Sequence, residues 1–136
     1  MSAFELRPIG SVRSELSDRD DAPKQGDEGG PEAWLEFDDD VYEALRDLKA
    51  GDEILLLTWL HLARRHVMRV HPRSDPARIL TGVFSTRSPD RPNPIGLHRV
   101  RVIAVDGLRV QVDHLEVLDG TPVIDVKAVL DEITDR

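Results

Sequence analysis

The sequence has 136 residues, 40% of them hydrophobic, and a formal net charge of −8 at pH 7. This length suits one domain with one core, and no apolar run approaches the roughly 18 residues of a membrane-spanning helix. Cysteine is absent, which excludes disulfides and thiolate metal sites; the N-terminus also lacks a signal-peptide pattern, so we expect a single cytoplasmic domain over residues 1–136.

In chain order, residues 4–14 alternate weakly and predict a strand, at an edge of the sheet because Pro8 cannot donate to a ladder. Residues 15–31 are polar and rich in glycine and proline, which predicts a long loop. A short strand over residues 33–37 precedes the one helix that we expect, over residues 38–51.

The helix prediction depends on an aspartate at its start as the cap and on an apolar face of Val41, Leu45 and Leu48. Gly51 lies just past the expected end, as glycine often does. The continuous apolar run over residues 53–60 then has the length of a strand and predicts the central buried strand of the sheet.

The second half of the chain contains only strands and loops. Residues 62–78 lack a clear period and predict a loop, and residues 79–84 predict a strand. Asp106-Gly107 is a strong turn signal between strands over 97–105 and 108–117. Their alternation predicts Val100, Val102, Val110 and Val112 on the covered face, opposite Arg99, Arg101, Arg109 and Gln111. A second Asp-Gly turn and a strand follow over residues 119–127. Many short strands with one short helix predict a mainly β fold, a closed or nearly closed single-sheet β-barrel.

The charge is unevenly distributed along the chain. Residues 1–60 carry 6 basic and 16 acidic side chains, whereas residues 61–109 carry 10 basic side chains, all arginine, and 3 acidic ones. Arginine without lysine favours bidentate recognition of carboxylate or phosphate. Cross-strand ion pairs on a solvated face are an equally weighted alternative.

The segment STRSPDRPNPIGL, residues 85–97, contains three of the nine prolines. Ser88, Arg91 and Asn93 each precede a proline, which prevents both a regular helix and a central strand. A stiff extended loop remains, with its carbonyls and arginine side chains held in place before a ligand arrives. Of all the segments considered, only this one favours a functional site by itself.

Two segments carry a resemblance to a known family. GVFSTRSPDRPNPIGL (82–97) and LDGTPVIDVK (118–127) resemble the TsaA/TrmO family, as do the shorter matches PIGSVRS, APKQG and WLH in the same order. The resemblance implies a β-barrel that dimerises and binds S-adenosylmethionine. It also implies N6-methylation of threonylcarbamoyl-adenosine beside the tRNA anticodon. The absence of a G-x-G-x-x-G motif between a strand and a helix agrees with a cofactor site unlike that of Rossmann methyltransferases.

The resemblance also implies a set of cofactor contacts. Arg87, stiffened by Pro89, can bind a carboxylate through two hydrogen bonds, and Asp119 can accept from hydroxyls or an ammonium group. Taken alone, an Asp-Gly pair is more often an ordinary turn, and His61 more often a structural histidine. The positions that match the family's cofactor contacts are Pro23, Lys24, Gln25, His61, Leu62, Arg87, Leu97, Leu118, Asp119, Gly120 and Thr121.

The acceptor side of the site departs from the family pattern. Asp125 and Lys127 occupy the family's D-I-K-P-Y motif and are the candidate catalytic residues, since a carbamoylated adenine N6–H needs a base or a polarising partner. Val129 stands where the family has tyrosine, and His98 stands where it has the serine after I-G-L. The cofactor side is therefore intact and the acceptor side altered.

The first functional hypothesis is a homodimeric methyltransferase that acts on tRNA, with Arg64, Arg65 and Arg69 as phosphate contacts. Two alternatives stay open: a related methyltransferase with a small-molecule acceptor, and a module that binds the cofactor or tRNA without turnover. No membrane partner is expected. No metal site is expected either, because His61, His66 and His71 are spaced by five and do not share a face of a helix or a strand.

Overall fold

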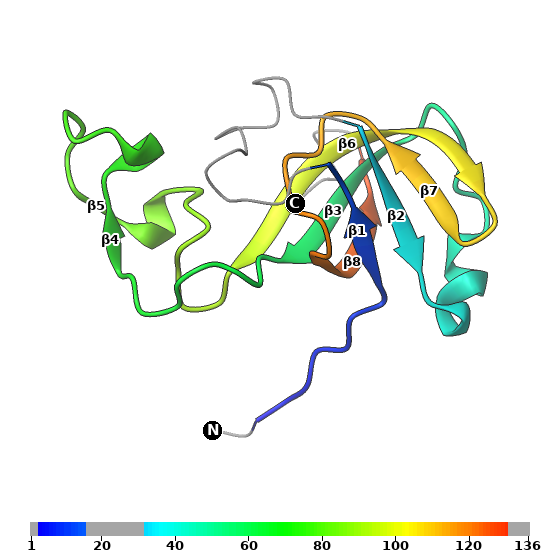
Figure 1. Cartoon of the computed structure of the whole chain (residues 1–136), viewed down its shortest axis with the longest axis horizontal. Helices are drawn as coiled ribbons and strands as arrows, with labels where there is room; N and C mark the ends of the chain where they lie inside the picture. Colours follow the sequence, from blue (N-terminus) through cyan, green and yellow to red (C-terminus); the bar gives the residue numbers. More distant parts are fainter. Residues whose placement is uncertain (1–2, 16–31, 131–136) are drawn as a thin grey trace.

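Six antiparallel strands close into a barrel in a computed structural model that describes residues 3–15 and 32–130. The order around the barrel is β1-β2-β7-β6-β3-β8, and every neighbouring pair is antiparallel (Figure 1). The predicted single-sheet barrel is thus confirmed. The strands are β1 (Gly10–Arg13), β2 (Ala33–Phe37), β3 (Glu53–Trp59), β6 (Ile95–Asp106), β7 (Arg109–Val112) and β8 (Pro122–Ala128).

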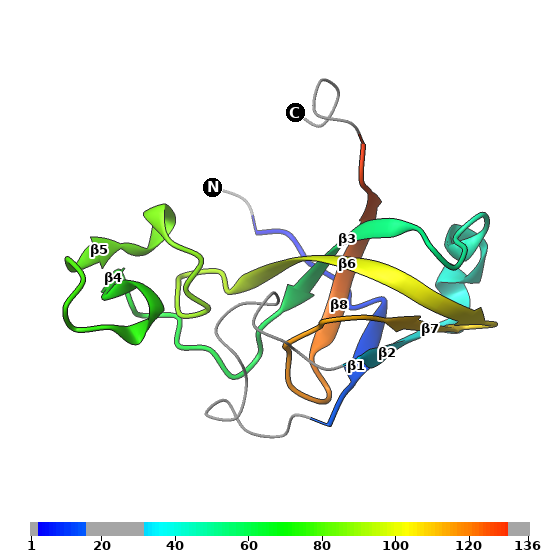
Figure 2. The same cartoon turned by 90° about the horizontal axis from the view of Figure 1, so that it is seen from above.

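Residues 61–94 form an arm that extends from one end of the barrel. The arm contains the two-stranded sheet of β4 (Arg69–Val70) and β5 (Thr81–Gly82), with the 3₁₀ helices η4 (Pro72–Ser74) and η5 (Val83–Ser85). Both views show this sheet to one side of the barrel, joined to it through β3 and β6 (Figures 1 and 2). The predicted loop over 62–78 therefore contains a short strand, and the predicted strand over 79–84 is only two residues long.

The core lies inside the barrel and consists of alternate residues of the strands. Val100, Val102, Val110 and Val112 are each at most 3% exposed, which confirms the predicted face of the hairpin. The apolar run of β3 also alternates: Ile54 and its alternate neighbours are buried, and the residues between them are only half-buried. The run was predicted to be buried throughout, but the wall of a single-sheet barrel has one core face only.

The predicted helix over residues 38–51 is wrong in type and length. The structure has a 3₁₀ helix, η3 (Asp39–Leu45), preceded by Asp38, whose side chain makes no capping hydrogen bond. The backbone leaves the helical region at Arg46 and turns through Asp47, whose φ is 73°. The predicted apolar face is confirmed, because Val41, Leu45 and Leu48 pack against the barrel core as partly buried side chains, although no residue of η3 is fully buried.

The first strand is not at an edge. β1 pairs with β2 on one side and with β8 on the other, and Pro8 lies before its first residue. At Gly10 a Cβ would lie 2.3 Å from the carbonyl oxygen of Glu36, so the close approach of β1 and β2 requires glycine. Closure of the barrel removes the edge that Pro8 had suggested.

Both Asp-Gly turns are present. Gly107 has φ of 61° and Gly120 has φ of 85°, in the left-handed region that glycine enters without cost. Most of the predicted loop over 15–31 lies outside the described residues. No helix within residues 3–15 and 32–130 is long and apolar enough to cross a membrane.

Candidate functional site

One end of the barrel collects most of the predicted cofactor residues. β3 ends there and β6 and β8 begin there, since Trp59 pairs with Ile95 and Thr58 pairs with Val123. His61 and Leu62 follow β3, Leu97 is the third residue of β6, and the loop 118–121 precedes β8. We call this end of the barrel the loop end. Pro23, Lys24 and Gln25 lie outside the described residues.

The proline segment is held at the loop end by arginine side chains. Arg91 donates from Nη2 to the carbonyls of Val83 (2.8 Å) and Thr86 (2.6 Å), and from Nε to that of Ser88 (2.8 Å). Prolines have no backbone N–H to donate to these carbonyls. The guanidinium of Arg91, which has several donors, supplies the hydrogen bonds instead. The segment is thereby fixed without belonging to a sheet.

Arg65 is a second support of the same segment. It donates to the carbonyl of Pro92 (2.7 Å) and to Oδ1 of Asn93 (2.9 Å), and its guanidinium lies 5.1 Å from the ring centroid of Trp59. Arg65 was predicted as a phosphate contact, yet its Nε and Nη2 already donate within the protein. Arg64 and Arg69 are exposed on the arm, where the backbone N–H of Arg64 donates to Asp90 Oδ1 at 2.8 Å.

Other arginines of residues 61–109 form pairs on the barrel wall. Arg99 and Arg101 both contact the Glu53 carboxylate, at 2.6 and 2.9 Å, and hold its pKa below the usual value, mainly through the hydrogen bond from Arg99. Arg109 lies over the ring of Trp34. The alternative of cross-strand ion pairs therefore accounts for this part of the arginine-rich region.

Arg87 differs from these arginines. It lies exposed in the proline segment, and its guanidinium has no hydrogen bond or ion pair with any residue in the described ranges. The hydrogen bonds of Arg91 fix the backbone on both sides of it, at Thr86 and Ser88. A cation on a rigid backbone with all its donors available is suited to an anionic ligand group.

His98 follows Leu97 on β6, and sequence reasoning did not assign it to the site. The ring Nε2 is 2.9 Å from Oγ1 of Thr58, which is fully buried. Burial lowers the pKa of His98 to about 4, and the positive charge of Arg87 contributes in the same direction. The imidazole is therefore neutral at physiological pH. The signal in the sequence was its place in the motif, where the resembling family has serine.

The loop 118–121 is closed by its own hydrogen bonds. Thr121 Oγ1 donates to the Leu118 carbonyl at 2.7 Å, the Gly120 N–H donates to the Val12 carbonyl at 2.8 Å, and Thr121 is only 2% exposed. Asp119 Oδ1 accepts from the N–H of Ser14 at 3.0 Å. The loop thus joins β1 to the start of β8 and leaves Asp119 exposed at the loop end.

The two candidate catalytic residues lie on the outer face of β8. Asp125 and Lys127 form an ion pair of 3.1 Å between partly exposed side chains. Asp125 is level with Leu57 of β3, which is level with Leu97 of β6. The structure therefore places Asp125 in one row across the sheet with a predicted cofactor residue.

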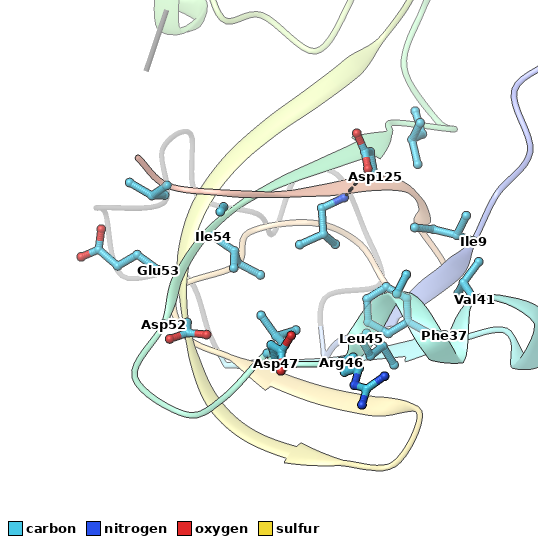
Figure 3. A pocket seen from close by; sticks show the side chains of 16 residues that line it. Ile9, Phe37, Val41, Leu45, Arg46, Asp47, Asp52, Glu53, Ile54 and Asp125 are labelled. Carbon is cyan, nitrogen blue, oxygen red and sulfur yellow. Dashed lines mark hydrogen bonds between the residues drawn. The ribbon is translucent and has the colours of Figure 1, made fainter. Parts of the chain in front are cut away.

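A cavity of about 780 Å³ lies at the other end of the barrel, under η3 (Figure 3). Its walls are mainly apolar, with Asp47 and Asp52 among its polar side chains. Asp125 and Val129 also line it, and none of the predicted cofactor residues does. Within the part of the chain that the structure describes, no three His, Asp or Glu side chains are grouped to hold a metal ion.

The protein is thus a closed antiparallel barrel, and the residues suited to binding a ligand lie mainly in the loops at one of its ends. A family model described as tRNA-methyltransferase O N-terminal domain matches residues 11–135. The chain belongs to this family.

Two curated relatives match this chain over nearly their whole length. A probable S-adenosyl-L-methionine-binding protein of Methanothermobacter thermautotrophicus is 43% identical over 128 residues, which cover 94% of this chain and 91% of the relative. An S-adenosyl-L-methionine-binding protein of Archaeoglobus fulgidus is 39% identical over 128 residues, which again cover 94% of this chain and 91% of the relative. The chain is thus similar to proteins named for binding of this cofactor.

Solved structures agree with the fold. This chain superposes on a crystal structure of TrmO from P. aeruginosa with a TM-score of 0.76 and 29% sequence identity, and the match covers 100% of this chain. A second TrmO structure gives 0.76 at 30% identity. The chain spans only 60% and 62% of those two chains, so they contain further structure beyond the shared barrel.

Proposed function

We propose that this protein binds S-adenosylmethionine at the loop end and methylates N6 of threonylcarbamoyl-adenosine beside the tRNA anticodon. The observation that carries the proposal is Arg87, a guanidinium without a described partner on a rigid segment. Its available donors fit the cofactor's carboxylate, and exposed Asp119 fits hydroxyl or ammonium groups. The names of the relatives support the choice of cofactor.

The cofactor supplies an already activated methyl group, so the protein has to position the acceptor and exclude water. In the proposal, Asp125 takes up the proton of the acceptor N6–H, and the ion pair with Lys127 at 3.1 Å orients that carboxylate. His61 and Leu62 lie at the end of β3 on the same side as Arg87 and would contact the cofactor from there.

The test is mass spectrometry of nucleosides from tRNA incubated with purified protein and the cofactor. We expect the N6-methylated nucleoside with wild type and a loss of at least about tenfold with Asp125→Asn, a conservative figure for the removal of a general base. Asp106→Asn is the matched control, because Asn-Gly keeps the turn between β6 and β7. Unmodified nucleosides with wild type would contradict tRNA as the acceptor.

A small-molecule acceptor is the second candidate, and the altered acceptor side favours it, since Val129 stands at the family's tyrosine position. Cofactor binding without any methylated tRNA nucleoside would support this candidate or the module without turnover. Transfer of a labelled methyl group from the cofactor to a compound in a metabolite extract would separate those two.

Binding of tRNA gives an independent test. Phosphate contacts by exposed Arg64 and Arg69 predict that log K falls by roughly 0.7–0.9 per contact for each decade of salt. Arg64→Glu with Arg69→Glu should flatten this dependence, whereas Arg7→Glu with Arg46→Glu, away from the arm, should not. Arg65 is left unchanged because it supports the proline segment. A salt response that is already flat in wild type would count against tRNA.

We also propose a homodimer, formed through the arm. Several large apolar side chains of the arm and of the start of β6 are exposed, which is unusual for a surface that stays in water. Phe84 is 83% exposed and Ile79 is 86% exposed. A second copy of the chain would cover this surface. The exposed apolar residues are Leu62, Met68, Ile79, Leu80, Phe84, Ile95 and Leu97.

A further inference from the structure

Two segments that cannot pair as strands join the arm to the barrel. The N–H of Leu60 donates to the carbonyl of Pro94 at 2.8 Å, directly after β3 and before β6. Pro94 and Pro92 have no N–H to donate in return, so a β ladder cannot continue between residues 61–65 and the proline segment. Other contacts have to keep these two segments side by side.

The predicted cofactor contacts at residues 61–62 lie at the tip of a turn that is tied on both sides. The N–H of Ala63 donates to the Leu60 carbonyl at 2.9 Å, which closes the turn. After the tip, the N–H of Arg64 donates to Oδ1 of Asp90 at 2.8 Å. A side-chain acceptor from the proline segment thus takes the place of the missing ladder.

Arg65 makes the larger part of this connection. Its Nε donates to the carbonyl of Pro92 at 2.7 Å, and its Nη2 donates to Oδ1 of Asn93 at 2.9 Å. Its guanidinium lies 5.1 Å from the ring centroid of Trp59, the last residue of β3. One planar group therefore joins the end of a barrel strand, the turn and the proline segment.

The connection continues along the proline segment to Arg87. Asp90, which accepts from Arg64, donates from its own N–H to Oγ of Ser88 at 3.3 Å. Arg91 holds the carbonyls on both sides of Arg87. The two sides of the predicted cofactor site are thus fixed relative to each other by contacts within the protein. A site that is ordered in advance loses less entropy when a ligand binds.

We propose that Arg65 is a positioning residue for the cofactor, which holds His61 and Leu62 at a fixed distance from Arg87. The inference rests on the proposed cofactor binding. A ligand with a nucleoside at one end and an amino-acid group at the other has to reach both sides of the site at once, so its affinity depends on this distance. The role replaces the phosphate contact that the sequence predicted for Arg65.

The first experiment measures binding of S-adenosylmethionine by calorimetry. Arg65→Lys keeps the charge, but an ammonium cannot make both hydrogen bonds and the contact with the ring. We expect binding about tenfold weaker than in wild type, because a charge-assisted hydrogen bond and the order of the site are lost. Adding Asn93→Asp to Arg65→Lys should recover part of the affinity, since a carboxylate pairs with the ammonium. Arg78→Lys is the control, as the side chain of Arg78 makes no contact that the structure describes.

The second experiment, amide hydrogen exchange, starts without a ligand. Exchange at Ala63 and Arg64 should become faster in Arg65→Lys, while β7 keeps its protection. Saturating S-adenosylmethionine should restore the protection, because the bound ligand orders the turn again. Asn93→Ala removes only one of the hydrogen bonds and should change both affinity and exchange in the same direction by less, even where Arg65→Lys does not fold.

Two results would overturn the inference. One is an affinity for S-adenosylmethionine that stays the same in Arg65→Lys and Asn93→Ala while the wild type binds. The other is weaker binding together with faster exchange throughout the barrel, which indicates a structural role. A wild type that does not bind S-adenosylmethionine would refute the proposed function itself, and the role of Arg65 with it.

Discussion

Gly96 leaves the space in which the side chains of Thr58 and His98 meet. Gly96→Ala should destabilise the protein by about 1–3 kcal/mol, because the new methyl group would overlap Thr58 and His98 in a packed interior. Gly82→Ala is the matched control, since nothing lies within 4 Å of a Cβ there and its φ is −58°. Urea unfolding measures the stability of both variants. Equal unfolding midpoints for Gly96→Ala and Gly82→Ala would contradict the crowding at Gly96.

His98 also predicts how stability depends on pH. Its pKa is about 4 in the folded protein, against 6.5 for an unperturbed histidine, so between these values the unfolded chain binds more protons. Stability should therefore fall as the pH falls from about 6.5 to 4, by up to roughly 3 kcal/mol from this group. Thr58, whose hydroxyl contacts the ring, has no titrating group and does not reverse the sign.

The measurement is urea unfolding at pH 7 and pH 5 for wild type and His98→Asn. We expect a smaller loss of stability at pH 5 in the variant, which lacks the titrating ring. The same pH dependence in both proteins would mean that carboxylates elsewhere determine it.

Among the structural elements, the proline segment depends on Arg91 for its shape. Arg91→Lys keeps the charge but cannot contact the three carbonyls of Val83, Thr86 and Ser88 at once, because an ammonium is not a planar fork. We expect a loss of roughly 1–3 kcal/mol. Amide hydrogen exchange should become faster in the proline segment, while β7 keeps its protection.

Arg78→Lys serves as the control for this change, as its exposed side chain makes no contact that the structure describes. Faster exchange throughout the barrel in Arg91→Lys would show global destabilisation instead of local release. An unchanged exchange rate in the segment would mean that the prolines alone keep it rigid.

For the molecule as a whole, the exposed apolar surface of the arm predicts association of two copies. Phe84→Glu should shift the protein from dimer to monomer at micromolar concentration, because it places a charge in the proposed interface. Tyr42→Glu, on η3 at the other end of the barrel, is the control with an aromatic side chain that is 58% exposed. Light scattering measures the mass, and a wild type that is already monomeric would contradict the dimer.

Local sequence patterns were enough to predict most of the barrel wall and the turns within it. β2, the β6–β7 hairpin with Asp106-Gly107, and β8 were predictable because alternation and turn chemistry are local properties of the chain. The proline segment was predictable for the same reason, since proline restricts the backbone whatever surrounds it. The family resemblance, also readable in the sequence, indicated Arg87 and the loop 118–121.

Features that depend on distant neighbours became visible only in the folded chain. Closure of the barrel gave β1 two partners in place of an edge, and the backbone leaves the helical region at Arg46, which ends η3 after seven residues. Arg65 and Arg87 look alike in the sequence, yet Arg65 is bound to Pro92 and Asn93, whereas Arg87 has no hydrogen bond or ion pair with the residues that the structure describes. The environment of His98 is a further example: its ring contacts Thr58, 40 residues away along the chain, and burial lowers its pKa, neither of which a local pattern records.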